Sequence, residues 1–119
     1  MYNNNIVLEK SKRFAIRIVN LYKYLTSEKK EFVLSKQVLR SGTSIGANIK
    51  ECINAESKQD FVHKLTLSLK EADETEYWLE LLHETDYITT HQFENIIADC
   101  KEIIRLLISI IKSTKGKTN

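Results

Sequence analysis

The chain has 119 residues, of which 29% are charged and 42% hydrophobic, with three glycines and no proline. This balance is typical of one folded domain and excludes a disordered chain. An all-β fold of this length needs frequent glycine- or proline-bearing turns, whereas a lack of proline permits long helices. The composition therefore predicts an all-α protein.

Apolar residues recur at helical spacing in four segments, about residues 7–25, 32–54, 58–85 and 90–112. Ser57 with Asp60, and Thr89 with Gln92, have the spacing of an N-terminal cap and mark the starts of the last two helices. Short connections place consecutive helices side by side in opposite directions. We expect a single domain over residues 1–119, an antiparallel up-down-up-down four-helix bundle.

The second segment contains a run of small residues, 41–47, with glycines at Gly42 and Gly46. Each glycine costs a helix roughly 1 kcal/mol relative to alanine, so a loop is one interpretation. The apolar spacing nevertheless keeps its phase across the run, from Val38 through Ile45 to Cys52. We predict a continuous helix in which the glycines let another backbone come close.

The two cysteines, Cys52 and Cys100, lack metal-ligand spacing and fall in apolar stripes, which indicates small core residues in a reducing compartment. The first seven residues lack the pattern of a signal peptide. The most apolar run, residues 103–111, is too short to span a bilayer. These features predict a cytoplasmic protein without a membrane segment.

The last two helices carry more apolar surface than one buried face requires. The residues outside their main apolar stripes are Leu67, Trp78 and Leu81 on the third helix and Ile96, Ile103 and Ile110 on the fourth. Apolar patches of this kind mark protein interfaces, so we expect these six residues to lie between copies of the chain in a homo-oligomer. A thick core within a monomer is the alternative.

The net charge of +2 hides an uneven distribution. Residues 8–31 hold seven basic and three acidic residues, whereas residues 56–87 hold three basic and nine acidic ones. The bases of the first helix lie opposite its apolar stripe with a tyrosine among them, a pattern that suits phosphates and bases of RNA or DNA. The predicted nucleic-acid-binding residues are Lys10, Lys12, Arg13, Arg17, Lys23 and Tyr24. The alternative is a solvated face or a partner for the acidic third helix.

One spacing resembles a metal site. Glu80 and His83 have the Glu-x-x-His spacing of di-iron bundles, but such a site needs the motif on two helices. The near repeat, Asp60 with His63, falls on the same helix. No catalytic motif is recognisable, so we expect no metal, no cofactor and no enzymatic activity.

A carboxylate, Glu76, falls inside the apolar arc of the third helix, where it needs a partner. Arg40 is the best-placed cation. Together with Ser44 and Asn48, the pair is predicted to form a polar clasp that fixes the register of the helices. A small pocket formed by the same four residues is the alternative.

Residues 39–51, Leu-Arg-Ser-Gly-Thr-Ser-Ile-Gly-Ala-Asn-Ile-Lys-Glu, resemble the signature segment of a bacterial protein family. Its members are four-helix bundles encoded in intervening sequences of large-subunit ribosomal RNA genes. Residues 60–65, 71–79 and 86–88 resemble its third-helix pattern, and the likeness extends from about residue 14 to residue 111. The segment Lys50-Glu51-Cys52 departs from it at its first and third positions, because the family more often has alanine, glutamate and glycine there.

This resemblance implies a homopentameric bundle with no established enzymatic activity. A more distant similarity, to the accessory protein of diversity-generating retroelements, implies work with a reverse transcriptase and nucleic acid, by analogy only. We therefore expect a non-catalytic oligomeric adapter that binds RNA or DNA. The alternative is a protein–protein interaction scaffold that binds no nucleic acid.

Overall fold

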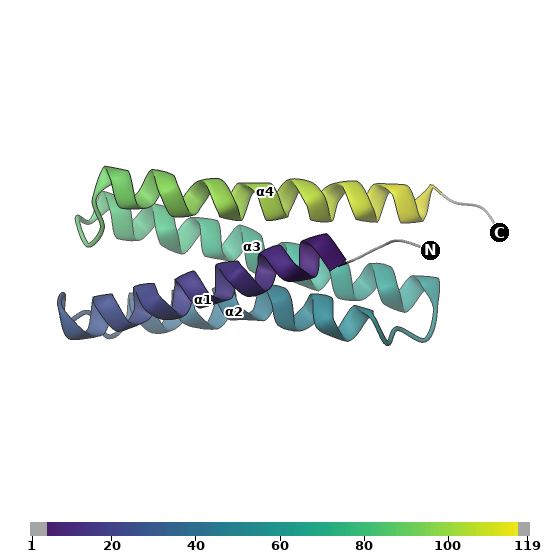
Figure 1. The fold of residues 1–119 in the computed structure, drawn as a ribbon, viewed down its shortest axis with the longest axis horizontal. Helices are drawn as coiled ribbons and strands as arrows, with labels where there is room; N and C mark the ends of the chain where they lie inside the picture. Colours follow the sequence, from purple (N-terminus) through teal and green to yellow (C-terminus); the bar gives the residue numbers. More distant parts are fainter. Residues whose placement is uncertain (1–4, 117–119) are drawn as a thin grey trace.

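The computed structural model describes residues 5–116, which form four helices joined by short connections. The helices are α1 (Asn5–Ser27), α2 (Leu34–Cys52), α3 (Lys58–Glu84) and α4 (Thr90–Lys115). Consecutive helices run in opposite directions along an elongated body (Figure 1). The predicted all-α four-helix bundle is confirmed, and residues 5–116 contain no strand.

Two predicted caps start α3 and α4. Ser57 Oγ accepts the backbone N–H of Asp60 at 3.0 Å. Thr89 Oγ1 accepts the N–H of Gln92 at 3.1 Å, and the Gln92 side chain accepts the N–H of Thr89 at 2.8 Å. Both caps satisfy amides that a helix leaves without partners in its first turn.

The start of α2 was predicted two residues too early. The buried carboxylate of Glu31 accepts the N–H groups of Val33, Leu34 and Ser35 at 3.1, 3.0 and 2.7 Å. These bonds supply the partners that the first turn of α2 needs. Phe32 and Val33 therefore lie in the connection before the helix, where both are exposed.

The continuous second helix is confirmed, because α2 runs unbroken through Gly42 and Gly46. A Cβ atom added at Gly42 would lie 2.8 Å from Cγ1 of Ile18 in α1, closer than packed carbon atoms approach. At Gly46 the nearest atom would be Cβ of Ser11, at 3.4 Å. The missing side chains thus let α1 pack closely on α2.

The buried seam of α4 includes the stripe that was expected to face another copy. Ile96, Ile103 and Ile110 are buried within the single chain together with Cys100 and Leu107. Assigning those three isoleucines to an interface between copies was therefore wrong. A bundle helix packs on two neighbours and on the core between them, so it buries a face wider than one stripe. No helix within residues 5–116 is long and apolar enough to cross a bilayer.

The predicted pairing of Arg40 with Glu76 is also wrong. The Arg40 guanidinium bonds Glu71 at 3.2 Å and also Glu74, and its side chain is 51% exposed. Glu71 and Glu74 are three residues apart and so share one face of α3, the face toward α2. Glu76 lies on another face, close enough to Cys100 of α4 to affect that thiol.

The other two residues of the predicted clasp bond their own helix. Ser44 Oγ donates to the carbonyl oxygen of Arg40 at 2.7 Å, and Asn48 Nδ2 donates to that of Ser44 at 3.0 Å. A different pair of hydroxyls joins α2 to α3, because Thr75 Oγ1 donates to Ser41 Oγ at 2.9 Å and both residues are buried. The buried polar contact between these helices is therefore made by neutral hydroxyls and not by an ion pair.

Candidate nucleic-acid interface

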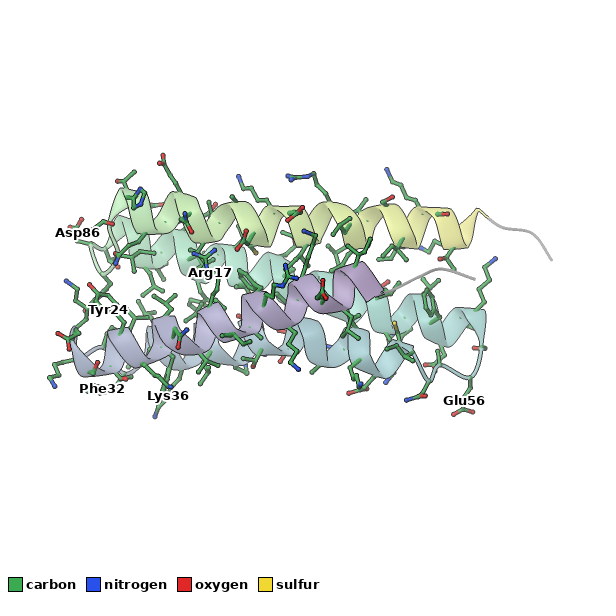
Figure 2. The ribbon with its side chains drawn as sticks, in the orientation of Figure 1. Arg17, Tyr24, Phe32, Lys36, Glu56 and Asp86 are labelled. Atoms are coloured by element: carbon green, nitrogen blue, oxygen red, sulfur yellow. The ribbon has the colours of Figure 1, made fainter. Side chains whose placement is uncertain are left out.

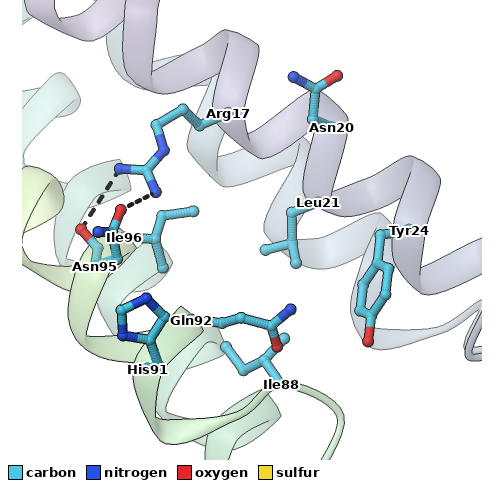
Figure 3. Close-up of a pocket in the computed structure, with 9 residues that line it drawn as sticks. All are labelled: Arg17, Asn20, Leu21, Tyr24, Ile88, His91, Gln92, Asn95 and Ile96. Atoms are coloured by element: carbon cyan, nitrogen blue, oxygen red, sulfur yellow. Dashed lines mark hydrogen bonds between the residues drawn. The ribbon is translucent and has the colours of Figure 1, made fainter.

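Two of the predicted phosphate-binding residues contact α4. Lys10 Nζ lies 3.4 Å from a carboxylate oxygen of Glu102. The Arg17 guanidinium bonds the carboxylate of Asp99 at 2.5 Å and both the side-chain and backbone oxygens of Asn95 (Figure 3). The charges of Lys10 and Arg17 are therefore used in joining α1 to α4.

The other bases of the predicted face are exposed. Arg13 pairs at 3.0 Å with Glu9, one turn earlier on α1, and an exposed pair of this kind contributes little to stability. Lys12 and Lys23 form no ion pair with any carboxylate of residues 5–116. These three bases remain accessible to an anionic ligand.

The connection between α1 and α2 carries exposed cations that the sequence analysis did not select, namely Lys29, Lys30 and the nearby Lys36 of α2. Lys29 Nζ lies 5.9 Å from the ring centre of Tyr24, within the outer range of a cation–π contact. Tyr24, Phe32 and Lys36 lie at the same end of the bundle (Figure 2). Four lysines within residues 23–36 were the available signal, but they span two helices and their connection and so follow no single helical period.

An open groove of about 490 Å³ lies between the C-terminal half of α1 and the start of α4. Figure 1 shows α1 diverging from α4 toward this end. Leu21, Ile88 and Ile96 supply apolar lining, and Asn20 and Gln92 supply amides (Figure 3). The lining contains no carboxylate and no thiol, and its titratable side chains are those of Arg17, Tyr24 and His91.

The contacts of His83 and the burial of Cys52 and Cys100 favour structural roles for these three side chains. His83 Nε2 lies 3.0 Å from Thr90 Oγ1, and its imidazole stacks on the ring of Phe93 at 4.5 Å. Burial raises the pKa of Cys52 and, with smaller contributions from nearby carboxylates, raises that of Cys100 to about 12. Such thiols stay protonated at neutral pH and are poor nucleophiles. Within residues 5–116, no three metal-ligating side chains cluster.

The α3 residues of the predicted oligomer interface are half-buried. Leu67, Trp78 and Leu81 each keep some exposed surface, and Trp78 packs against the core while its Nε1 donates to Glu74 at 2.9 Å. The exposed ring of Tyr77 meets Trp78 edge to face at 5.1 Å. Leu67, Trp78 and Leu81 are the part of the predicted interface that still offers apolar surface to another copy.

The fold and these surroundings define the class of the protein as an antiparallel four-helix bundle. Residues 3–109 match the model of the 23S rRNA-intervening sequence protein family, and the chain belongs to this family. This is the family that residues 39–51 resemble, so the expectation from the sequence is confirmed.

A solved structure agrees with this assignment. It is described as a protein of unknown function from the S23 ribosomal protein family of Bacteroides thetaiotaomicron, and it is 64% identical to this chain. The match covers 92% of this chain and 97% of that one, with a TM-score of 0.91. No curated protein matches the chain. Neither the family description nor that of the solved structure names a catalytic activity.

Proposed function

We propose that the protein is a non-catalytic adapter that binds RNA or DNA through the exposed lysines of α1, of the adjoining connection and of the first turn of α2. The observation that carries this proposal is a set of five exposed lysines without an ion-pair partner among residues 5–116, Lys12, Lys23, Lys29, Lys30 and Lys36. Cations left without carboxylate partners are available to neutralise phosphates, which is the main source of affinity for nucleic acid of any sequence.

Self-association is the second part of the proposal. The half-buried apolar residues of α3 support it, and the resemblance to the family favours a pentamer. Each added copy would repeat the five lysines, so weak contacts with one long strand would add through multivalency. Light scattering at micromolar concentration tests this, because a mass of 13.9 kDa, that of one chain, would refute it.

Charge reversal tests the nucleic-acid interface. The double variant Lys12→Glu, Lys23→Glu should weaken binding to mixed RNA and DNA oligonucleotides alike, because phosphate contacts carry no sequence information. Each lost contact with a single strand should flatten the slope of log affinity against log salt by about 0.7. Fluorescence anisotropy over a range of salt concentrations measures both quantities.

The matched control is Lys101→Glu, Lys112→Glu, which makes the same change in net charge at exposed positions of α4. It should bind nearly as tightly as the wild type. Equal losses in the two variants would mean that net charge alone, and no particular face, attracts nucleic acid. Circular dichroism confirms that each variant is folded.

A protein–protein interaction scaffold is the second candidate. It is favoured by the acidic surface of α3, where Asp73, Tyr77 and Glu84 are exposed. An exposed tyrosine among carboxylates suits a basic protein partner. If the wild-type protein retains no nucleic acid even at low salt, the adapter proposal fails and the scaffold takes its place.

A further inference from the structure

The exposed end of the bundle at the α1–α2 connection combines apolar and cationic side chains. Phe32 is 53% exposed and Val33 70% exposed, and neither is needed to cover the core. Lys29, Lys30 and Lys36, which flank these two residues in the sequence, are also exposed. We call this surface, with Lys23 and Tyr24 of the last turns of α1, the α1–α2 tip (Figure 2).

The backbone of the α1–α2 tip is held in place by hydrogen bonds. The N–H of Glu31 donates to the carbonyl oxygen of Leu25 at 2.9 Å, which ties the connection to the end of α1. The Glu31 carboxylate accepts three N–H groups from the start of α2, and Lys30 adopts a left-handed conformation with φ of 55°. Phe32 is thus presented from a fixed backbone, which lowers the entropy lost when it contacts a ligand.

The charge of the tip is positive. Residues 23–36 contain four lysines and two glutamates, and the carboxylate of one of these, Glu31, is buried and occupied by backbone amides. Glu28 alone is exposed among the acids of this segment. The occupant that fits is therefore an anion with a flat apolar surface.

We propose that the α1–α2 tip binds single-stranded nucleic acid, with Phe32 stacking on a base while the lysines contact the adjoining phosphates. This inference rests on the proposed function and adds which strand state the protein selects and which residue selects it. Bases in a duplex are stacked on each other and offer no open face to Phe32, whereas those of a single strand do. Stacking on an aromatic side chain tolerates any base, so the tip selects single strands without selecting sequence.

Substitution of Phe32 tests the inference, because this residue lies outside the helices and is exposed. Phe32→Ala should weaken binding to a single-stranded oligothymidylate of about 16 nucleotides by about tenfold. Binding to a duplex of the same length should stay unchanged. The matched control is Ile53→Ala, which removes an exposed apolar side chain from the connection after α2 and should change neither affinity.

A second variant reports stacking directly. Phe32→Trp should retain single-strand binding, and its added fluorescence, measured as the difference from the wild type with its one tryptophan, should be quenched by the oligothymidylate. Equal wild-type affinity for single and double strands, or full binding by Phe32→Ala, would overturn the inference while leaving the adapter proposal intact. No retention of either strand form would defeat both.

Vesicles of phosphatidylcholine with phosphatidylserine test the competing anionic surface, since lysines around an exposed phenylalanine also suit a membrane. The inference expects no Phe32-dependent binding to these vesicles. Phe32-dependent vesicle binding without single-strand preference would assign the tip to lipid and overturn it.

Discussion

The two sides of the bundle differ in how closely their helices pack, although partly exposed ion pairs, such as Arg40 with Glu71 and Arg17 with Asp99, occur on both. Between α2 and α3, the hydroxyls of Ser41, Thr75 and Ser68 are fully buried, and Ser68 Oγ donates to the backbone of α2 at 2.8 Å. Between α1 and α4, the contacts include the partly exposed side chains of Lys10 and Arg17, and an open groove follows. The α2–α3 side is therefore the more closely packed of the two, and the α1–α4 side is the more open to solvent.

This difference separates stability from the candidate interface. Close packing makes the buried side sensitive to changes of a single methylene. Ion pairs at a solvated surface contribute little, so the α1–α4 side tolerates change. The exposed lysines lie on α1, on its connection to α2 and in the first turn of α2. Substitutions on the two sides should therefore differ in size and in what they alter.

The largest effect is expected for Ile103→Ala. Ile103 is 1% exposed, so removing its side chain leaves a cavity in the core and should lower the free energy of unfolding by about 3 kcal/mol. Urea denaturation measures the change, and light scattering should return the wild-type oligomeric mass. A changed mass with unaltered stability would contradict the assignment of Ile103 to the core of one chain.

Gly42→Val should have the second largest effect on stability, because the added Cβ would lie closer to the buried side chain of Ile18 than packed carbon atoms approach. Overpacking of this kind should cost about 2 kcal/mol. Gly46→Ala is the matched control, since the added Cβ would lie 3.4 Å from Cβ of Ser11 and alanine favours a helix. A thermal midpoint for Gly42→Val at or above that of Gly46→Ala would show that α1 and α2 are not in close contact there.

Glu31→Gln should cost about 1 kcal/mol at neutral pH, because the carboxylate caps α2. Burial raises the pKa of Glu31, but the hydrogen bonds from Leu34, Ser35 and Val33 outweigh it, and the pKa is lowered overall. The carboxylate therefore stabilises the fold above its unfolded-state pKa, and this contribution is lost as the pH falls through the lower folded-state value.

The stability difference between wild type and Glu31→Gln should accordingly shrink below about pH 4. Chemical denaturation at a series of pH values measures it. Parallel stability curves for the two proteins down to acid pH would mean that the capping carboxylate does not titrate as the structure implies.

The smallest effects on stability are expected for the ion pairs formed by arginines of α1. Arg17→Met should cost no more than about 1 kcal/mol, because its partners are partly exposed. Arg13→Met should cost still less, since Arg13 and Glu9 are both largely exposed. Calorimetry compares the two with the Ile103 variant. A loss for Arg17→Met as large as that for Ile103→Ala would contradict the small contribution expected of the partly exposed ion pairs between α1 and α4.

Helical periodicity, with the spacing of the cap residues, was sufficient to predict the four helices, the unbroken α2 and the caps at Ser57 and Thr89, because these depend on neighbours within a few residues. It did not predict that both apolar stripes of α4 enter one core. That outcome depends on how far α4 turns toward its neighbours, which a single helix's pattern does not specify.

The periodicity of apolar residues also did not predict which side chains of neighbouring helices bond each other. Arg40 was assigned to the carboxylate that interrupts an apolar arc, but it bonds Glu71 and Glu74, because those carboxylates face α2. The role of Glu31 was missed for a related reason. Its side chain folds onto the amides that follow it, whereas a helix cap is usually sought among serine, threonine, aspartate and asparagine.

The most direct test of the proposed function is the salt dependence of binding between the wild-type protein and a labelled single-stranded oligothymidylate. If the exposed lysines neutralise about three to four phosphates, the slope of log affinity against log salt should be about −2 to −3. Fluorescence anisotropy at constant pH measures this slope. An absence of binding at low salt, or an affinity that does not change with salt, would contradict the proposal that these lysines bind nucleic acid.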